Sequence, residues 1–416
     1  MKQAMVANHD EHQLVASDGT ARHAELTATL IASRTELEPY ASEWNELLAS
    51  SRADSIFLTW EWISTWLDTV YPEAPLCVVV VREHNGPLVA IAPFYCTDLR
   101  LLGMVKYRCL RIIGDCQSGG EYGDVIARSG YEHKGIVCVA RELLKHPSMW
   151  DCMWLCNMAG RTGSPQRLTA ACTALGLYAH TRPRDFGSVA LPDTHDAYLT
   201  RLSKNGRDQI KRKDKRLRAE HTLECVSCGA AEEVPQFLSD LFALHRRRWE
   251  SVGQAGSFVR RPAMKRFYEA FAPVALRRGW LRLYGLRVDG IIRAVQYGYA
   301  YHGVFSQLQE GYDPDGFDGA GNVLRNQVIK MCIEEKMSEY DFLGGFSEHK
   351  RRWGAEPVTG YDLFVGRKSP KTRVLFWKNV WPTGRFISEG RPASEGRSHD
   401  HKGSKFTSVR GGTLDA

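Results

Sequence analysis

The sequence predicts an α/β fold made of two similar units, each a mixed, mostly antiparallel sheet flanked by helices. Two turns carry this prediction. Asn85-Gly86 and Asp289-Gly290 each separate two apolar runs, and such pairs are strong hairpin signals because they tolerate positive φ. Helical patterns precede both turns, and strand-helix-strand patterns follow them. The turns stand about 200 residues apart, which indicates a duplicated fold.

In the first unit, an aromatic helix precedes the hairpin, and strands and helices alternate after it. The predicted segments are, in order, the helix FLTWEWISTWLDTV at 57–70, the strands 76–83 and 87–96, the run LRIIG at 110–114, the strand 123–128, the helix Glu132–Lys145, the strand 149–158 and the helix Pro165–Gly176. Trp60, Trp62 and Trp66 recur at helical spacing. We expect them to pack between the two units rather than to form a carbohydrate platform, because large aromatic rings dominate protein cores.

In the second unit, two helices precede the hairpin, one at 237–253 and one around Ala263–Arg277. The predicted segments that follow are the strands 280–288, 291–300 and 303–313, the helix 322–336 and the strand 339–345. Each unit therefore begins its sheet with antiparallel strands and ends it with a strand-helix-strand crossover.

The length of 416 residues exceeds one ordinary core and predicts two globular units with tails. We divide the chain into a disordered N-terminal tail (1–25), a first unit (26–190), a second unit (191–366) and a basic, largely disordered C-terminal tail (367–416). Both ends are rich in small and polar residues, a composition that cannot bury enough apolar surface to fold.

Composition excludes several classes of protein. The chain is 43% hydrophobic and 25% charged, as in soluble globular proteins, and its net charge of +7 favours anionic ligands. The odd count of eleven cysteines predicts a reducing cytoplasm. Cys225 and Cys228 lack a second pair at zinc spacing, so we expect no metal. We also expect no signal segment and no membrane span, and no hydrolase, NTPase or zinc-protease motif occurs.

The segment 203–220 is strongly basic, SKNGRDQIKRKDKRLRAE, and it allows three interpretations: a nucleic-acid contact, a nuclear address or the solvated face of a helix. Leu199, Leu202, Gly206, Ile210 and Leu217 form a narrow apolar seam on a helical wheel, which predicts an amphipathic helix. A helix built into the start of the second unit disfavours the nuclear address. We expect it to turn two cations toward an anionic donor or acceptor, namely Arg207 and Lys211.

Four motifs occur in a recognisable order: LPDTHDAYLTRLSKNGRDQIKRKDKRLRAE at 191–220, LHRRRWESVG at 244–253, GYDPDGFDGAGNVL at 311–324 and YDFLGGFSEHKRRWG at 340–354. They resemble the CelD/BcsL branch of the GNAT acyltransferase superfamily, which is associated with polysaccharide biosynthesis. FLTWEWISTWL and VAIAPFYC in the first half fit as well. The resemblance spans roughly residues 30 to 366 and implies tandem GNAT domains, similar to Fem-type aminoacyl transferases, with a degenerate first unit and a catalytic second one.

The expected donor site is a glycine-rich turn before a helix. Gly319, Ala320, Gly321 and Asn322 would direct bare backbone N–H groups and a helix dipole at the donor's phosphates, where the resemblance also implies donor binding. The alternative is a tight turn that only caps the helix. The chain departs from the superfamily here, because Gly316 stands where an Arg or Gln is usual.

The strand 303–313 alternates, so Gln307 and Gln309 are predicted on one face and Glu310 on the other. The two glutamines would position an acceptor or an oxyanion, because an inward polar side chain is costly unless it has a partner. Glu310 is a candidate base if its face lines the cleft. A structural role between strands is the alternative for each of them.

The last candidates surround Gly344-Gly345, where the resemblance implies that two central strands diverge and leave room for the acyl group. Asp341 would deprotonate the acceptor through water or hold the following loop. The resemblance makes Lys350 the foremost functional cation, which would hold donor phosphate or an oxyanion. His349 is a further candidate by its pKa. For both residues a solvated basic loop is the alternative.

The sequence therefore predicts a cytoplasmic acyltransferase that moves an acetyl or longer acyl group from acyl-CoA to an amine or hydroxyl of a small molecule or glycan precursor. An enzymatic alternative uses aminoacyl-tRNA as the donor, which the basic segment would suit. A third possibility is a binding or scaffold protein whose GNAT unit has lost its donor.

Overall fold

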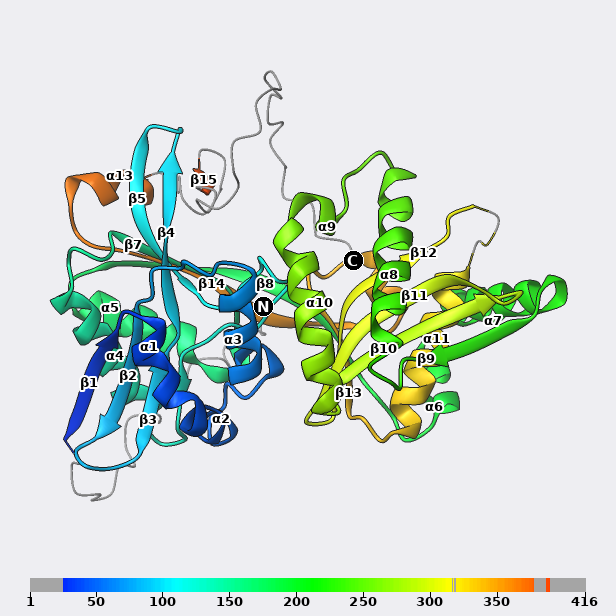
Figure 1. The fold of residues 1–416 in the computed structure, drawn as a ribbon, viewed down its shortest axis with the longest axis horizontal. Coiled ribbons are helices and arrows are strands. Elements are labelled where there is room, and N and C mark those ends of the chain that lie inside the picture. The colour runs from blue at the N-terminus through cyan, green and yellow to red at the C-terminus, as the bar shows by residue number, and fades with distance from the viewer. Residues whose placement is uncertain (1–24, 316, 318, 378–386, 390–416) are drawn as a thin grey trace, which may run out of the picture.

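The computed structural model describes residues 25–315, 317, 319–377 and 387–389. The chain forms two α/β units side by side, with helices flanking the sheets (Figure 1). One sheet of eleven strands, in the order β15-β4-β5-β7-β14-β8-β13-β12-β11-β10-β9, runs through both units, and a sheet of four strands, β1-β2-β3-β6, belongs to the first unit alone. The predicted fold class, two α/β units with mostly antiparallel sheets, is confirmed.

The first unit contains all the predicted helices and hairpin strands. Its strands are β1 (Leu26–Ile31), β2 (Val78–Glu83), β3 (Leu88–Ala92), β4 (Phe94–Leu101), β5 (Val105–Ile112), β6 (Ile126–Ala127), β7 (Cys152–Ala159) and β8 (Tyr178–Ala190). Its helices are α1 (Arg34–Leu37), α2 (Ala41–Ala49), α3 (Trp60–Thr69), α4 (Glu132–Lys145) and α5 (Ser164–Ala174), with short 3-10 turns at Glu38–Tyr40, Ile56–Leu58 and Gly160–Thr162.

The strand predicted at 87–96 is two strands in two different sheets. β3 pairs with β2 and β6, whereas β4 pairs with β5. Pro93 separates them. Because proline has no N–H to donate and a fixed φ, a continuous central strand cannot pass through it. The chain therefore leaves one sheet and enters the other at this residue.

The second unit follows the predicted order. Its helices are α6 (His195–Arg201), α7 (Lys204–Glu220), α8 (Val234–Glu250), α9 (Ser257–Arg260), α10 (Pro262–Arg277), α11 (Ala320–Glu334) and α12 (Glu348–Arg352). Its strands are β9 (Leu223–Ser227), β10 (Leu281–Val288), β11 (Ile291–Tyr301), β12 (Val304–Tyr312) and β13 (Glu339–Gly344). Within the range predicted as a C-terminal tail, α13 (Pro370–Phe376) and β15 (Ile387–Glu389) are ordered elements. Residues 1–24, 378–386 and 390–416 of the predicted tails lie outside the described residues.

Two strands join the units through backbone hydrogen bonds. β14 (Glu356–Gly366) lies between β7 and β8 of the first unit, although it follows all strands of the second unit in sequence. The thirteen-residue β8 pairs with β14 along its length and with β13 at its end. The boundary that we predict after residue 190 falls at the end of β8, and the sheet continues across it.

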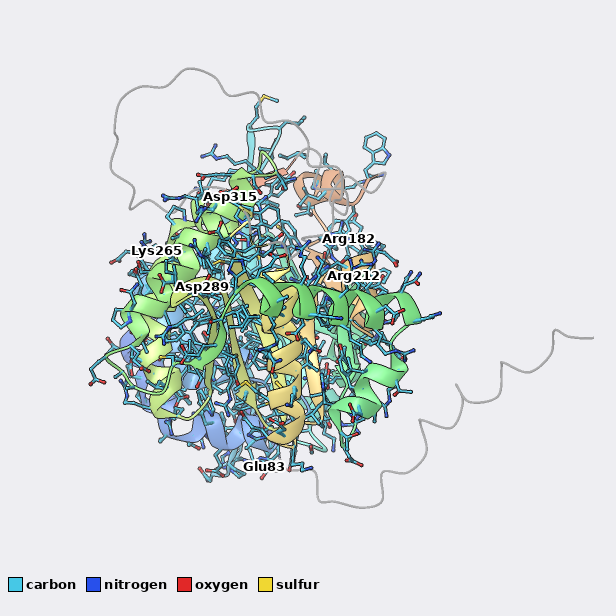
Figure 2. The ribbon with its side chains drawn as sticks, turned by 90° about the vertical axis from the view of Figure 1, so that its right-hand side faces the viewer. Glu83, Arg182, Arg212, Lys265, Asp289 and Asp315 are labelled. Carbon is cyan, nitrogen blue, oxygen red and sulfur yellow. The ribbon has the colours of Figure 1, made fainter. Side chains whose placement is uncertain are left out.

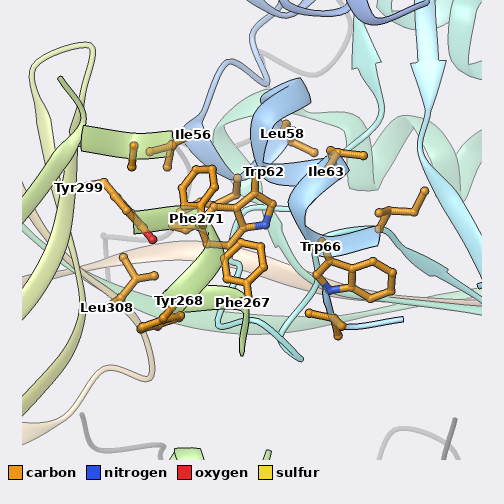
Figure 3. Packing of buried hydrophobic residues seen from close by; sticks show 14 of the residues in the cluster. Ile56, Leu58, Trp62, Ile63, Trp66, Phe267, Tyr268, Phe271, Tyr299 and Leu308 are labelled. Atoms are coloured by element: carbon orange, nitrogen blue, oxygen red, sulfur yellow. The ribbon is translucent and has the colours of Figure 1, made fainter. Parts of the chain in front are cut away.

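An aromatic core fills the space between the two units. Trp62 on α3 is fully buried and lies with its ring centroid 4.5 Å from that of Phe267 and 5.0 Å from that of Phe271, both on α10 (Figure 3). Tyr299 on β11 contacts the same indole at 5.8 Å. The indole N–H donates to the Gly114 carbonyl at 3.1 Å. The expectation that these tryptophans pack between the units is confirmed for Trp62.

Each of the eleven cysteines is free. Among the described residues, no helix is both long enough and apolar enough to cross a membrane.

Replacing Trp62 by Ala should lower the free energy of unfolding by about 3–5 kcal/mol, because it opens a cavity where both units meet. Urea unfolding followed by circular dichroism measures this. Trp377, which is 65% exposed, is the matched control, and its replacement by Ala should change the stability by less than about 0.5 kcal/mol. Equal effects of the two substitutions would contradict the packing role of Trp62.

Candidate active site

A cavity of about 80 Å³ lies between the two units. The second unit contributes Gln307 to Glu310 of β12, Phe342 to Gly344 of β13, and side chains from α8 to α10. The first unit contributes a loop after β5 that contains Cys116 and Glu121. The cavity is therefore built from both halves of the chain.

The cavity exists because two parallel strands diverge. β12 and β13 pair only over Val304–Ser306 with Glu339–Asp341. Beyond this point Leu343 adopts a left-handed conformation with φ of 60°, and Gly345 follows with φ of 74°. A left-handed leucine is unfavourable, so surrounding contacts must hold it.

Asp341 supplies one of these contacts. Its carboxylate accepts hydrogen bonds from the Leu343 N–H at 2.7 Å and from the Tyr122 hydroxyl of the first unit at 2.7 Å. Burial raises the pKa of Asp341 to about 6, although the bond from Tyr122 opposes the rise. Of its two predicted roles, this geometry favours holding the strand end over proton abstraction.

Lys350 supplies the other contact. Its side chain is 1% exposed, and Nζ donates to the carbonyls of Phe342, Leu343 and Gly344 at 2.9, 3.3 and 2.6 Å. Ser347 caps the short helix α12 on which Lys350 lies. The ammonium therefore reaches the diverging strand end, where it binds backbone, rather than a solvated loop.

A β-bulge in β12 changes which side chains share a face. Tyr297 pairs with Gln309 and Gly298 pairs with Gln307, so Leu308 has no partner in the register. The Gln307 amide donates to the Glu310 carboxylate at 3.2 Å. The prediction that Glu310 lies on the opposite face from Gln307 is wrong, because the extra residue resets the alternation.

Glu310 is the centre of a buried ionic network. Its carboxylate forms ion pairs with Arg325 of α11 and, at 3.1 Å, with Arg248 of α8. Burial alone would raise the pKa of Glu310, but the charges of Arg325 and Arg248 outweigh it and hold the pKa at about 2. Such a carboxylate is a weak base. His349 joins the network, since its Nε2 accepts from Arg325 at 2.6 Å.

The remaining glutamine lies on the cavity side of β12. Gln309 lines the cavity and is partly exposed, whereas Gln307 is buried and accepts a hydrogen bond from the Tyr340 hydroxyl at 2.9 Å. Both predicted acceptor ligands line the cavity, and Gln309 is the more exposed of the two. The prediction that they share a face is wrong, because the bulge pairs them with the adjacent residues Gly298 and Tyr297.

The predicted donor turn lies at the start of α11. Gly319 is its N-cap, with φ of 104° and no capping side chain, so the first N–H groups of the helix have no partner within it. A Cβ atom at Gly319 would come within 3.0 Å of the Lys213 side chain, and one at Gly321 within 3.1 Å of the Tyr312 ring. Both glycines thus allow close packing, and the aliphatic stem of Lys213 of α7 lies against the turn.

The basic helix α7 lies across the second unit, with Arg212 on it (Figure 2). It begins at Lys204 after the N-cap Ser203 and buries Gly206, Ile210 and Leu217. The continuous seam that we predict from Leu199 is interrupted, because α6 ends at Arg201. Two predicted cations differ in setting. Arg207 is half-buried and donates to the Leu199 carbonyl at 3.5 Å. Lys211 is exposed.

Glu121 is the residue that sequence reasoning missed. It follows Gly119-Gly120 in the first unit, lines the cavity and lies beside Gly344, where an added Cβ would meet its Oε1 at 2.9 Å. Its Oε2 is buried and accepts no hydrogen bond within the described part of the chain. Burial, and to a lesser extent nearby Cys116, raise the pKa of Glu121 to about 8. The only local signal was an acid directly after two glycines.

A second polar cluster borders the cavity. Asp115, Cys116 and Cys156 place ligand atoms within 4.8 Å of one another. The buried guanidinium of Arg111 lies among them, 3.0 Å from Asp115 and 3.5 Å from the Cys156 sulfur. A fixed cation at this place disfavours a metal ion by charge repulsion.

Comparison with known proteins agrees with this geometry. Residues 204–351 match the family model described as an acetyltransferase (GNAT) domain. The matched residues lie in the second unit and include the diverging strands, the glycine-rich turn and Lys350.

The fold is similar to that of solved structures. FemX is 11% identical with a TM-score of 0.56, covering 81% of this chain and 96% of FemX. A conserved protein of unknown function from Bacteroides thetaiotaomicron is 14% identical with a TM-score of 0.49 over 82% and 100%. A tandem GNAT protein from the clavulanic acid biosynthesis pathway is 13% identical with a TM-score of 0.43 over 83% and 99%. No curated protein matches the sequence. The likeness to FemX is one of fold.

Replacing Glu310 by Gln leaves two buried guanidinium groups without their carboxylate. We expect the free energy of unfolding at neutral pH to fall by about 3–5 kcal/mol, as measured by urea unfolding. Glu348, which forms a surface ion pair with Arg351, is the matched control, and its change to Gln should cost less than about 1 kcal/mol.

The wild type and Glu310→Gln should also differ in how their stability depends on pH. The pKa of Glu310 in the folded state is about 2, below the ordinary value of 4.5, so its ion pairs stabilise the fold above that ordinary value and lose this effect as the pH falls toward 2. The stability difference between the wild type and Glu310→Gln should therefore narrow on acidification. A difference independent of pH would contradict the assignment.

Proposed function

We propose that the chain is an acyltransferase that moves an acetyl or other acyl group from acyl-CoA to an amine or hydroxyl acceptor. The divergence of β12 and β13 beside a cavity is the observation that carries the proposal, because it leaves room for a thioester between two strands inside a GNAT domain. A role in polysaccharide or cell-envelope biosynthesis, as in the CelD/BcsL branch, is part of the proposal and rests on the sequence motifs alone.

The start of α11 supports acyl-CoA as the donor. The first turn of a helix and the positive end of its dipole favour phosphate, although the Ala320 N–H already donates to the Phe317 carbonyl at 3.0 Å. The aliphatic stem of Lys213 lies beside Gly319. We propose that Gly319, Ala320, Gly321 and Asn322 bind the pyrophosphate. The thioester would then extend along β12 toward Gln309.

Glu121 is the group that we propose to accept the acceptor's proton. The attacking nitrogen or oxygen forms a bond to the thioester carbon, its proton passes to the Glu121 carboxylate, and the carbon–sulfur bond breaks to release coenzyme A. A carboxyl with a pKa of about 8 is a stronger base than an ordinary one, and its Oε2 has no competing hydrogen bond among the described residues. Asp341 and Lys350 are proposed as positioning residues that hold the strand end open.

A second candidate uses aminoacyl-tRNA as the donor. The observation that favours it is the placement of a strongly basic helix, α7, directly beside the donor turn through Lys213. Under this candidate Arg207 and Lys211 contact the tRNA backbone, whereas under the first they contact the acyl-CoA phosphates or an anionic acceptor. His349 serves both by keeping Arg325 in place.

Titration calorimetry with acetyl-CoA separates these candidates. We expect binding by the wild type and at least about tenfold weaker binding by Gly321→Val, because the added methyl groups meet the Tyr312 ring and cover the helix N-terminus. Gly229→Val, at a glycine with open space around it, is the matched control. Binding of tRNA without acetyl-CoA favours the second candidate, and binding of neither would exclude both.

Replacing Glu121 by Gln should lower kcat at least about 100-fold while leaving acetyl-CoA affinity unchanged, because the residue acts on the acceptor. In the wild type, kcat/KM should rise with pH and level off above a pKa of about 8, since only the ionised carboxylate accepts a proton. Assays that measure the free thiol of released coenzyme A after quenching at fixed times give both quantities. Glu73→Gln, at an exposed acid of the same unit, should behave as wild type, and a full rate for Glu121→Gln would exclude the role.

A further inference from the structure

Exposed apolar side chains occur at the β4–β5 hairpin tip and on the neighbouring α13. Eight large hydrophobic residues are exposed in the described part of the chain, and seven of them lie on three elements: Leu102, Met104 and Val105 at the β4–β5 hairpin tip, Val374 and Trp377 on and after α13, and Val252 and Val259 between α8 and the end of α9. The eighth is Ile291. In Figure 1 the hairpin and α13 lie at the upper left, whereas the end of α8 and α9 lie over the other unit.

The hairpin tip is unfavourable for the isolated protein. Leu102 has a φ of 52°, a region that costs energy for a residue other than glycine, asparagine or aspartate. Leu102 is 59% exposed and Met104 is 77% exposed, so burial within the fold does not offset the strain of the turn. A strained turn that presents apolar side chains to water indicates a partner outside the chain.

Cations surround this tip. Arg100 and Lys106 lie on the hairpin, and Lys368, Lys371 and Arg373 lie at α13; all five are exposed. Among the described residues, Asp98 forms an ion pair with Lys106 at 2.8 Å and Asp151 one with Lys371 at 2.9 Å, and Glu389 of β15 pairs through its backbone with Leu99. The five cations outnumber these three acids. The local charge is therefore positive. α13 is held beside the hairpin because the Tyr107 hydroxyl donates to the Lys371 carbonyl at 2.9 Å.

We propose that this side, defined by Leu102, Met104, Trp377, Arg100 and Arg373 and called the apolar-basic face, binds the surface of an anionic lipid bilayer. Leucine and methionine would enter the acyl region, a tryptophan suits the interface, and lysine and arginine attract anionic headgroups. This inference goes beyond the proposed acyl transfer and does not depend on it.

Two other occupants fit less well. A second copy of the chain would place the same cations opposite each other, which is repulsive. The β4 edge is also unavailable for strand pairing between copies, because β15 pairs with Leu99 to Leu101 there. Nucleic acid would neutralise the cations but would leave Leu102 and Met104 without an apolar environment, since base recognition relies on aromatic stacking and hydrogen bonds.

Co-sedimentation of the full chain with vesicles tests the proposal. We expect binding to phosphatidylcholine vesicles that contain about one quarter phosphatidylglycerol, with weak binding to phosphatidylcholine alone. The double variant Leu102→Asn, Met104→Ser should bind the anionic vesicles at least about tenfold more weakly, because it removes the inserted side chains. Arg100→Gln with Arg373→Gln should also weaken binding by roughly tenfold or more.

The variants are chosen so that unfolding cannot explain a loss of vesicle binding. Asparagine adopts positive φ more readily than leucine, so Leu102→Asn should keep or raise the melting temperature while binding falls. Ile291→Ser, away from the apolar-basic face, should bind as wild type. The proposal is overturned if the wild type does not bind anionic vesicles, or if the Leu102→Asn, Met104→Ser variant binds them as tightly as the wild type. It is also overturned if the wild type binds RNA and not vesicles, or if it forms a dimer that this variant abolishes.

Discussion

The geometry of the candidate site depends on one buried ammonium. Lys350 Nζ binds three successive carbonyls at the end of β13, and a buried cation is tolerated only where such donors are fully used. The β13–β8 register is interrupted between Asp341 and Gly344, and the Lys350 side chain lies against Gly187 of β8. By binding the carbonyls of this interrupted segment, Lys350 stabilises the end of β13 beyond its last pair with β12.

The first unit completes the site instead of merely covering it. Tyr122 bonds to Asp341 across the interface, and its neighbour Glu121 lies at Gly344. This alignment needs a rigid junction, which the aromatic core around Trp62 and the insertion of β14 between β7 and β8 provide. The first unit therefore places a carboxyl group inside the cavity.

Local patterns predicted much of the fold, and non-local pairing limited the rest. The helix Glu132–Lys145 and both hairpins were predictable, because apolar periodicity and turn residues can be recognised within a short stretch of sequence. The insertion of β14 was not, since a strand's partners are fixed by the whole sheet. The bulge at Leu308 moves Glu310 to the other face of β12, and an alternating residue pattern does not reveal a bulge. Lys350 and Asp341 were found near the cleft, but Glu121 was missed because the cavity assembles residues far apart in sequence.

A crystal structure of the protein with coenzyme A tests the central claim most directly. We expect pyrophosphate at the backbone of Gly319 to Asn322, with the thiol between β12 and β13 and near Glu121. Coenzyme A bound elsewhere, or bound with its thiol remote from the diverging strands, would contradict it.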